Sequence, residues 1–148
     1  AGDYIVMIVA GHNARKDYHY NETEELFYQL EGHIEVNIQE DGKKRTMQLG
    51  PGDMYLHPAK VPHSPVRKEG SIGLVIERKR AEMNVDDGLL WFCDNCNHKL
   101  YETYFTLHDI EKDFLSHFKH FYNSKELRTC DNCGTIMPVD ERFIAKES

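Results

Sequence analysis

The sequence lacks the features of a membrane protein and of a nucleic-acid-binding protein. No hydrophobic run in its 148 residues approaches the ~20 apolar residues of a membrane helix. Lys and Arg total 18 against 25 Asp and Glu, the net charge is −7, and the basic residues are scattered along the chain. Residues 1–10 read as a strand already under way and carry no secretory signal. We therefore expect no membrane segment and no nucleic-acid partner.

Cysteine is also scarce: the four cysteines form two Cys-x-x-Cys pairs and none is left over. The pairs are Cys93–Cys96 and Cys130–Cys133, and both have Asp-Asn as filler. In a chain without a secretory signal, this grouping favours a metal site over disulfides. Four thiolates suit tetrahedral Zn or Fe and leave no position for substrate chemistry. A redox Cys-x-x-Cys, or His98 in place of one cysteine, remains an alternative.

Short segments with β periodicity are abundant from residue 3 to about 80. In the strand that begins at Glu25, alternation places Glu25, Phe27 and Gln29 on one face. In the last strand of this block, Val75 and Glu77 share a face, directed into a barrel if the register holds. Regular Gly, Pro and Asp-Gly turn signals separate the segments and predict a jelly-roll β-barrel, hence a mainly β fold. The expected strands are 3–10, 25–31, 33–40, 43–49, 54–57 and 71–79.

The remaining chain predicts a small extension. Residues 81–88 are polar and acidic and form a connection, followed by strand-like segments at 89–93 and 99–106. A helix is expected over 109–122, with Asp109 as its N-cap and an aromatic stripe that packs the extension rather than forming a cofactor site. The predicted division is therefore a barrel core at 1–80 and a C-terminal extension at 81–148, packed on the barrel or completing it.

His19, Glu25 and His63 are the candidate ligands of a catalytic metal. Two imidazoles and one carboxylate on neighbouring β segments can form a facial triad, which leaves half of the coordination sphere open. The carboxylate favours Fe(II) or Mn(II). The alternative is a loop histidine, a solvated strand glutamate and a turn histidine that never meet. His57, six residues before His63, is the nearest rival ligand.

The spacing of these residues resembles the two motifs of the cupin superfamily. The first motif matches at His19, Glu25 and Gly32. The second matches at Gly52, Pro58 and His63. The sequence departs from the pattern at Asp17, where many cupins have another histidine, and at Lys60 and Arg67. The loss of the paired histidine implies a set of two histidines and one carboxylate.

Four longer segments resemble the 3-hydroxyanthranilate 3,4-dioxygenase family, including its form with a two-knuckle cysteine tail. They are Arg15-Lys-Asp-Tyr-His19, Glu24-Glu25-Leu-Phe-Tyr-Gln29, His63-Ser-Pro-Val-Arg67 and Val75-Ile-Glu77-Arg. The resemblance runs from about residue 3 to 135 and lacks the family's N-terminal segment. It implies Fe(II) on His19, Glu25 and His63, and a rubredoxin-like iron or zinc on the four cysteines, Cys93, Cys96, Cys130 and Cys133.

The resemblance also implies the residues that contact the substrate. Arg15, Arg67 and Glu77 match the family's catalytic and substrate-contacting positions, and Glu25 is also expected to contact the substrate. An arginine can hold a benzoate carboxylate with two parallel hydrogen bonds, which a lysine cannot do. For Glu77 the alternative is a strand-end ion pair with Arg78 or Arg80.

The implied activity is ring opening of 3-hydroxyanthranilate by O₂ to 2-amino-3-carboxymuconate semialdehyde. This product leads to quinolinate and NAD in tryptophan–kynurenine catabolism, and the family implies a cytoplasmic homodimer. Two other functions stay open from the residues alone. One is a metal-free binding or sensor domain, and the other is a cupin isomerase or a dioxygenase for a related aminophenol or catechol.

Overall fold

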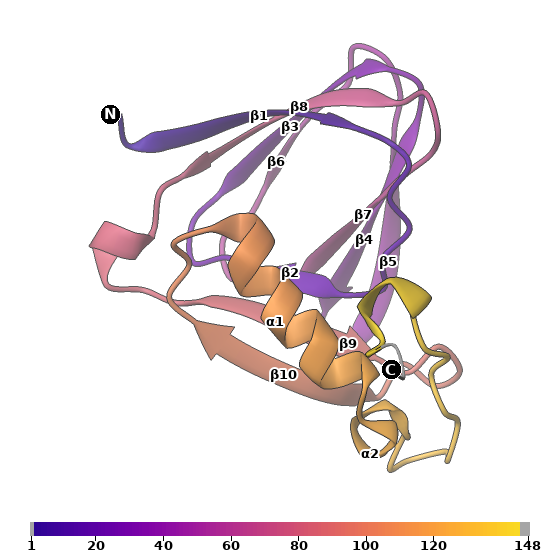
Figure 1. The fold of residues 1–148 in the computed structure, drawn as a ribbon. Coiled ribbons are helices and arrows are strands. Elements are labelled where there is room, and N and C mark those ends of the chain that lie inside the picture. The colour runs from indigo at the N-terminus through magenta and orange to yellow at the C-terminus, as the bar shows by residue number, and fades with distance from the viewer. Residues whose placement is uncertain (1, 146–148) are drawn as a thin grey trace.

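The computed structural model describes residues 2–145, and most of its regular structure is strand (Figure 1). One long helix, α1 (Ile110–Tyr122), follows the strands, together with the short helix α2 (Lys125–Arg128) and the 3-10 turns η1 (Ala81–Met83) and η2 (Glu141–Phe143). No helix in residues 2–145 has the length and apolar character to cross a membrane. The strands are β1 (Tyr4–Ala10), β2 (Tyr18–Tyr20), β3 (Glu25–Glu31), β4 (Ile34–Glu40), β5 (Lys43–Leu49), β6 (Met54–His57), β7 (His63–Arg67), β8 (Ile72–Arg78), β9 (Asp87–Phe92) and β10 (Lys99–Phe105).

The strands form two antiparallel sheets that face each other, which confirms the predicted mainly β, cupin-like barrel. The four-stranded sheet has the order β1-β8-β3-β6, and the six-stranded sheet has the order β10-β9-β2-β7-β4-β5. Figure 1 shows the first sheet above and the second curving below and to the right. The hairpin signal Asp41-Gly42 is confirmed, since β4 pairs with β5 from Glu40↔Lys43 to Ile34↔Leu49.

Alternation along the strands directs the expected side chains into the space between the sheets. Phe27 and Val75 are buried there with Ile34, Val36 and Ile38, and each of these side chains is at most 3% exposed. Burial of these side chains supplies much of the stability of the barrel, at about 25 cal/mol for each Å² of apolar surface removed from water. The inward face of β3 and β8 also carries polar groups, and these form the candidate site.

Two strands were not expected from the sequence. β2 spans three residues, and His63 begins strand β7 rather than lying in the loop predicted for it. Both segments are too short or too rich in proline to show a β pattern by themselves. They become strands because neighbours flank them on both sides: β9 and β7 flank β2, and β2 and β4 flank β7. Tertiary pairing has overridden the weak local signal.

The chain after residue 80 contributes strands to the barrel's own sheet. β9 pairs with β2, with Leu89 opposite His19, and β10 forms the edge beyond β9. Asp109 caps α1 as predicted, since its side chain accepts a hydrogen bond from the backbone N–H of Lys112. Helix α1 covers β9 and β10 through an apolar cluster that includes Trp91 and Phe121, whose rings stack at 4.3 Å.

Candidate metal centre and active-site cavity

The structure brings His19, Glu25 and His63 together. His19 and His63 are register partners on adjacent strands β2 and β7, and Glu25 begins β3 in the opposite sheet. One ligand atom from each of the three residues lies within 4.8 Å of the others. His63 Nε2 is 2.8 Å from a carboxylate oxygen of Glu25. The short β2 and β7 pairing therefore creates a cluster that the sequence indicated only through motif spacing.

The donor atoms of this cluster fit a divalent transition metal. Glu25 is 5% exposed and His63 is 1% exposed. Among residues 2–145, Glu25 Oε2 and His63 Nδ1 are buried without a hydrogen-bond partner. Such atoms are costly unless something binds them. Burial alone would raise the pKa of Glu25, but the charge of His63, whose Nε2 lies 2.8 Å from Glu25 Oε2, outweighs burial and lowers this pKa to about 2. Glu25 is therefore an anionic oxygen ligand at neutral pH.

His57, the rival ligand, lies outside the cluster of potential ligands. Its Nδ1 is 2.9 Å from the Tyr55 hydroxyl and its Nε2 is 2.7 Å from the carbonyl oxygen of Val61. Burial and the adjacent His63 lower the pKa of His57 to about 4. With both ring nitrogens engaged and its ring 4.4 Å from that of His63, it packs behind the cluster as a neutral support.

Asp17 occupies the position where many cupins carry another histidine. It is buried, and desolvation raises its pKa. A side-chain oxygen lies 3.2 Å from Nε of Arg15. Asp17 is not part of the group that could hold a metal. The structure thus leaves a set of two histidines and one carboxylate at this cluster, in agreement with the departure noted in the sequence.

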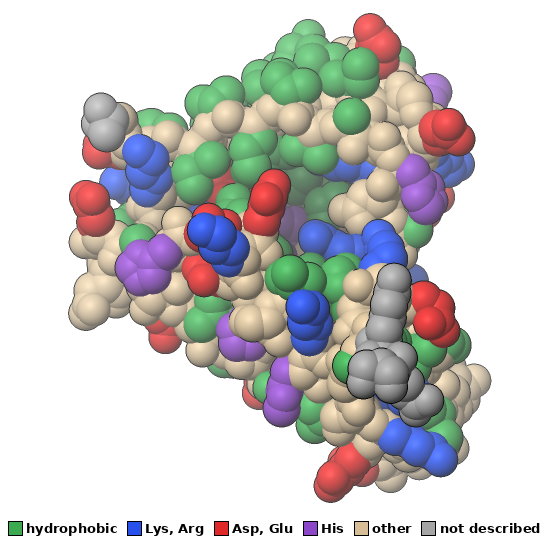
Figure 2. All heavy atoms as spheres, viewed as in Figure 1, with side chains coloured by type: hydrophobic (Ala, Val, Ile, Leu, Met, Phe, Trp, Pro, Cys, Tyr) green, Lys and Arg blue, Asp and Glu red, His purple; other side chains and the backbone are tan. Residues whose placement is uncertain are grey.

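A cavity of about 250 Å³ opens above the cluster. The predicted substrate residues Arg15, Arg67 and Glu77 all border it, together with the three candidate ligands. Figure 2 shows the hollow between the upper sheet and helix α1, with hydrophobic side chains in its wall and basic side chains at one edge. Its apolar walls come from Met7, Val9, Phe27, Pro65, Val75, Ile110 and Phe114. The cavity thus combines apolar walls, two arginines that could bind an anionic group, and the three candidate metal ligands.

Two of the wall residues belong to the extension and were not predicted. Ile110 and Phe114 project from α1, and the ring of Phe114 lies 5.3 Å from that of His19. The sequence assigned this stripe to packing of the extension, and that packing is confirmed, since Phe114 belongs to the apolar cluster around Trp91. Periodicity identifies the buried face of a helix but not all of its partners, so the contact with the cavity was not predicted.

Arg67 is buried with part of its guanidinium free. It is 3% exposed, and its Nη1 has no hydrogen-bond partner in residues 2–145. A Cβ built on Gly73 would lie 2.8 Å from that nitrogen, so the guanidinium needs a glycine at this position. Burial lowers the pKa of Arg67, yet guanidinium remains charged in proteins. Because Arg67 borders the cavity, this unpaired guanidinium N–H is a potential donor for an anionic group.

Arg15 is positioned by both parts of the chain. Its Nε forms an ion pair with Asp17 at 3.2 Å, and the guanidinium lies over the ring of Phe118 in α1, 4.9 Å from the ring centre. A cation over an aromatic face is attracted by roughly 0.5–2 kcal/mol. Helix α1 therefore contributes to the placement of this arginine at the cavity edge.

Glu77 shows both arrangements that the sequence left open: it faces the cavity, and it pairs with Arg80. It faces the cavity beside Val75, and its carboxylate accepts hydrogen bonds of 3.3 Å from Arg80 and from Asn21. Burial and the nearby Glu25 carboxylate raise its pKa, although Arg80 acts in the opposite direction. This carboxyl group can hold a proton more readily than an ordinary glutamate.

Arg80 and Asp87 are buried neighbours of the cluster, although the sequence placed Asp87 in a polar connection and considered Arg80 only as an ion-pair partner of Glu77. Asp87 is fully buried, and its Oδ2 is 2.6 Å from His19 Nε2. Arg80 donates to both oxygens of Asp87 at 2.7 Å. Burial would lower the pKa of His19, but the hydrogen bond to Asp87 and nearby carboxylates raise it. No local pattern in the sequence distinguished this pair from other charged residues.

The four cysteines also come together, 93 and 96 with 130 and 133. Their sulfur atoms lie within 4.8 Å of one another, and they form no disulfide. Cys93 is 3.6 Å from Cys133 and Cys96 is 3.5 Å from Cys130, so the pairs interleave. Hydrogen bonds with Thr135 lower the pKa of Cys133 to about 5. His98, the alternative ligand, is not part of the group.

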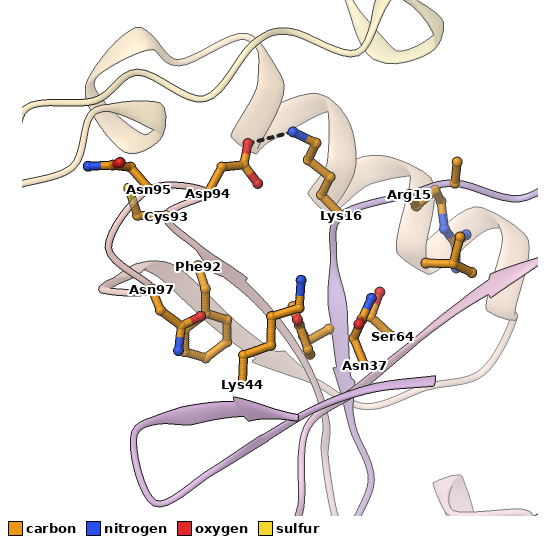
Figure 3. Close-up of a pocket in the computed structure, with 13 residues that line it drawn as sticks. Arg15, Lys16, Asn37, Lys44, Ser64, Phe92, Cys93, Asp94, Asn95 and Asn97 are labelled. Atoms are coloured by element: carbon orange, nitrogen blue, oxygen red, sulfur yellow. Dashed lines mark hydrogen bonds and ion pairs between the residues drawn. The ribbon is translucent and has the colours of Figure 1, made fainter. Parts of the chain in front are cut away.

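A second hollow of about 300 Å³ separates this cysteine cluster from the outer face of the barrel. Figure 3 shows Lys16 reaching Asp94 of the first knuckle across it, with Lys44 on another side. Asn97 and Gln39 exchange amide hydrogen bonds of 2.7 and 2.8 Å. The knuckle is thus tied to the barrel by polar contacts and lies apart from the cavity above His63.

Comparison with known proteins identifies the family of this chain. A model of the 3-hydroxyanthranilic acid dioxygenase family matches residues 1–122. A Xanthomonas campestris protein named 3-hydroxyanthranilate 3,4-dioxygenase is 53% identical over 98% of this chain and 82% of its own length. A Bacillus thuringiensis protein of the same name is 44% identical over 93% of this chain and 77% of its own length. Among solved structures, a cupin-2 domain protein from Shewanella frigidimarina has 26% identity and a TM-score of 0.41, over 53% of this chain and 72% of that one. With the family matched over most of its length, the chain belongs to the 3-hydroxyanthranilic acid dioxygenase family.

Proposed function

We propose that this chain opens the ring of 3-hydroxyanthranilate with O₂ to give 2-amino-3-carboxymuconate semialdehyde, using Fe(II) held by His19, Glu25 and His63. The observation that carries the proposal is one cavity in which these three residues meet the unpaired guanidinium of Arg67. The relatives described above bear the name of this activity.

The donor set supports iron as the metal. Two imidazoles and one carboxylate are typical of non-haem Fe(II) oxygenases, because three protein ligands leave positions open. Bound there, Fe(II) would supply electron transfer between the aromatic ring and dioxygen, so that both oxygen atoms enter the product. Neighbouring residues bind, orient and protonate the substrate.

Arg67 binds the substrate carboxylate in this proposal, and Arg15 assists it from the cavity edge. A charge-assisted hydrogen bond in a buried site is roughly twice as strong as a neutral one. The free Nη1 of Arg67 would gain a partner on binding, which removes the cost of leaving a buried donor unsatisfied. The carboxylate contact fixes which ring edge faces the ligands, and such orientation lowers the barrier.

The apolar walls hold the aromatic ring and exclude water. Phe27 and Val75 bound it from the barrel, and Phe114 bounds it from helix α1. Glu77 acts as the proton-holding group for the substrate's polar substituents. Its raised pKa, caused by burial and by the Glu25 carboxylate, supports that role because a general acid–base works best near the operating pH.

The four-cysteine cluster is proposed to hold a second Fe or Zn with a structural role. Four thiolates would complete a tetrahedral shell and leave no position for a substrate. We also propose the two-part organisation expected from the sequence, with residues 1–80 as barrel core and 81–148 as the extension. The extension supplies strands β9 and β10 to the barrel sheet, which supports a role in completing the barrel.

A homodimer is the proposed assembly, supported by an apolar outer surface on the four-stranded sheet. Tyr4, Val6 and Ile8 on β1 are 59%, 63% and 65% exposed, and Met54 and Leu56 on β6 are 63% and 55% exposed. Large exposed apolar patches mark interaction surfaces. Val6→Glu should shift the sedimentation coefficient to that of a monomer, and an unchanged coefficient would contradict the dimer through this surface.

A place in quinolinate and NAD formation, within tryptophan–kynurenine catabolism in the cytoplasm, completes the proposal. Its chemical basis is the product, since the semialdehyde can cyclise to quinolinate. The four unpaired cysteines suit a reducing compartment.

The test of the activity starts from anaerobic reconstitution with Fe(II). Air-saturated 3-hydroxyanthranilate is then added while oxygen uptake and the absorbance of the semialdehyde are followed. One O₂ consumed for each new chromophore supports the proposal, and His63→Ala should abolish both signals. His33→Ala, which changes an exposed histidine, is the matched control. Stoichiometric bound iron with neither oxygen uptake nor chromophore would overturn the assigned reaction.

A further inference from the structure

We infer that Asp87, which accepts two hydrogen bonds from Arg80, is the positioning residue that fixes the orientation of the His19 imidazole for metal binding. The segment after residue 80 then forms part of the metal site. The inference rests on the metal site proposed above and goes beyond it, because neither residue is one of the proposed ligands.

The contact between Asp87 and His19 defines the state of the imidazole. Asp87 is fully buried, and its Oδ2 lies 2.6 Å from His19 Nε2. A carboxylate anion only accepts hydrogen bonds, so Nε2 carries the proton and donates it. In a neutral ring the other nitrogen, Nδ1, then keeps its lone pair. The bond therefore selects the tautomer of His19 and limits rotation of its ring.

Arg80 holds the Asp87 carboxylate itself in one orientation. Its Nε donates to Oδ1 and its Nη2 donates to Oδ2, both at 2.7 Å, in the forked geometry that arginine forms with carboxylates. Its Nη1 donates to the carbonyl oxygen of Arg78 at 2.6 Å, which anchors the guanidinium to the end of β8. Two hydrogen bonds from Arg80 and one from His19 therefore fix the orientation of the Asp87 carboxylate.

The backbone places Asp87 with little freedom. It begins β9, and the next residue, Gly88, is the register partner of Tyr20 on β2. A Cβ built on Gly88 would lie 2.6 Å from the ring of Tyr104 and 3.0 Å from Cβ of Tyr20, so the strands approach this closely because position 88 is a glycine. Leu89 is the partner of His19, which fixes the carboxylate two residues earlier beside the imidazole.

An ion pair that served stability alone would need only its own two partners. Arg80 and Asp87 form two hydrogen bonds with each other, and the Asp87 carboxylate accepts a third from His19, a candidate metal ligand. Carboxylates that accept a hydrogen bond from a ligating imidazole orient it, and their loss typically weakens metal binding by about 10- to 100-fold. Arg80 Nη2 also lies 3.3 Å from Glu77, so one guanidinium contacts both the support of His19 and the proton-holding carboxyl group.

The first test compares two neighbouring substitutions. Asp87→Asn replaces one acceptor oxygen by an NH₂ group, so a bond from Arg80 is lost in either orientation, and the His19 bond is lost as well when the NH₂ group replaces Oδ2. Asp86→Asn makes the same change of charge one residue earlier, where the carboxylate is exposed and accepts from the Thr106 hydroxyl at 3.0 Å. The readout is the dissociation constant of Fe(II), measured anaerobically in competition with a chelator on the full chain. We expect a rise of about 10- to 100-fold for Asp87→Asn and none for Asp86→Asn.

A second measurement needs no substitution at Asp87. Imidazole ¹⁵N NMR of the metal-free wild-type chain, with His19 assigned from the signal missing in His19→Gln, reports which ring nitrogen carries the proton. A proton on Nε2 supports the inference, and a proton on Nδ1 overturns it. Arg80→Lys keeps the charge but not the fork, and a rise in the dissociation constant smaller than that of Asp87→Asn is the expected result.

The outcomes separate this inference from the proposed metal site. Wild-type chain that does not bind Fe(II) would overturn both. Tight binding by the wild type with equal binding by Asp87→Asn would overturn only the role of Asp87. Equal losses in Asp87→Asn and Asp86→Asn would also overturn it, since the effect would then follow net charge rather than the contact with His19.

Discussion

The two clusters of potential metal ligands differ in their donor atoms, in whether they open into a cavity, and in the elements that carry them. The barrel cluster joins two imidazoles and a carboxylate from three strands of two sheets, and it opens into a cavity. The cysteine cluster uses four sulfur atoms from two short knuckles. An incomplete donor set beside a cavity leaves room for a substrate, whereas four thiolates around one ion leave none. The difference separates, within one small chain, a cluster beside which a substrate could bind from a cluster that leaves no such room.

The largest expected effect comes from removing a ligand of the barrel cluster, which tests whether the two clusters bind metal independently. His63→Ala takes away one of three donors, so we expect metal affinity to fall by more than the ~100-fold loss typical of supporting residues. Iron analysis after gel filtration checks the loss at the barrel, and the cysteine-bound metal should remain. Loss of both metals together would contradict two independent sites.

The reciprocal change removes a thiolate. Cys130 is 2% exposed, and Cys130→Ser should release the tail metal and lower thermal stability, because structural metal binding is coupled to folding. The effect on the free energy of unfolding should reach several kcal/mol. Thermal unfolding with and without a chelator measures it. Retained Fe(II) in the barrel is expected, and a still-folded variant that cannot bind Fe(II) would contradict the separation.

The barrel cluster should also make the free energy of unfolding of the metal-free protein depend on pH. The folded-state pKa of Glu25 is about 2 against an ordinary 4.5, so its contribution to stability is full above about pH 4.5 and is lost as the pH falls through 2. The contribution is on the order of 3 kcal/mol. Urea unfolding from pH 6 to 2 should show a stability gap between wild type and Glu25→Gln that closes with acid. Exposed Glu24→Gln is the control, and a gap that persists at pH 2 would contradict this origin.

The barrel cluster also differs from the cysteine cluster because the cavity beside it contains Arg67, which is proposed to bind the substrate carboxylate. Arg67→Ala should raise KM by about 10- to 100-fold, since hydrogen bonds to charged groups contribute about 1.5–3 kcal/mol. Bound iron should stay unchanged, and Arg67→Lys should recover only part of the loss because it lacks the fork. Steady-state kinetics with parallel iron analysis gives both values. Lost iron with an unchanged KM for the remaining active fraction would refute the anchoring role.

The sequence was more informative about local features than about contacts between distant segments. The Cys-x-x-Cys knuckles, the Asp41-Gly42 hairpin and the Asp109 cap depend on neighbouring residues, and each is present as predicted. The triad is non-local, and its residues were found through motif spacing and resemblance. Their roles as ligands remain predictions.

What the sequence could not supply was the environment of these groups. β2 and β7 exist because neighbouring strands pair with them. Phe114 belonged to a recognisable amphipathic helix, but nothing local indicated that this face reaches His19. Asp87 appeared as one more acidic residue in a polar connection until the pairing of β9 with β2 buried it. In each case a contact between distant segments decides the role of the residue.

The smallest predicted effect tests the link between the two clusters. Lys16 adjoins Arg15 and pairs with Asp94 of the first knuckle, but both side chains are nearly half exposed. Surface ion pairs contribute about 0–1 kcal/mol, so Lys16→Ala should lower the free energy of unfolding by less than that and leave KM unchanged. Arg15 stays in place because Asp17 and Phe118 hold it from other directions. Urea unfolding and steady-state kinetics check both values, with Lys44→Ala as the control on the opposite side of the same hollow. A several-fold rise in KM for Lys16→Ala alone would mean that the knuckle helps to position Arg15, and the two clusters would then not be independent.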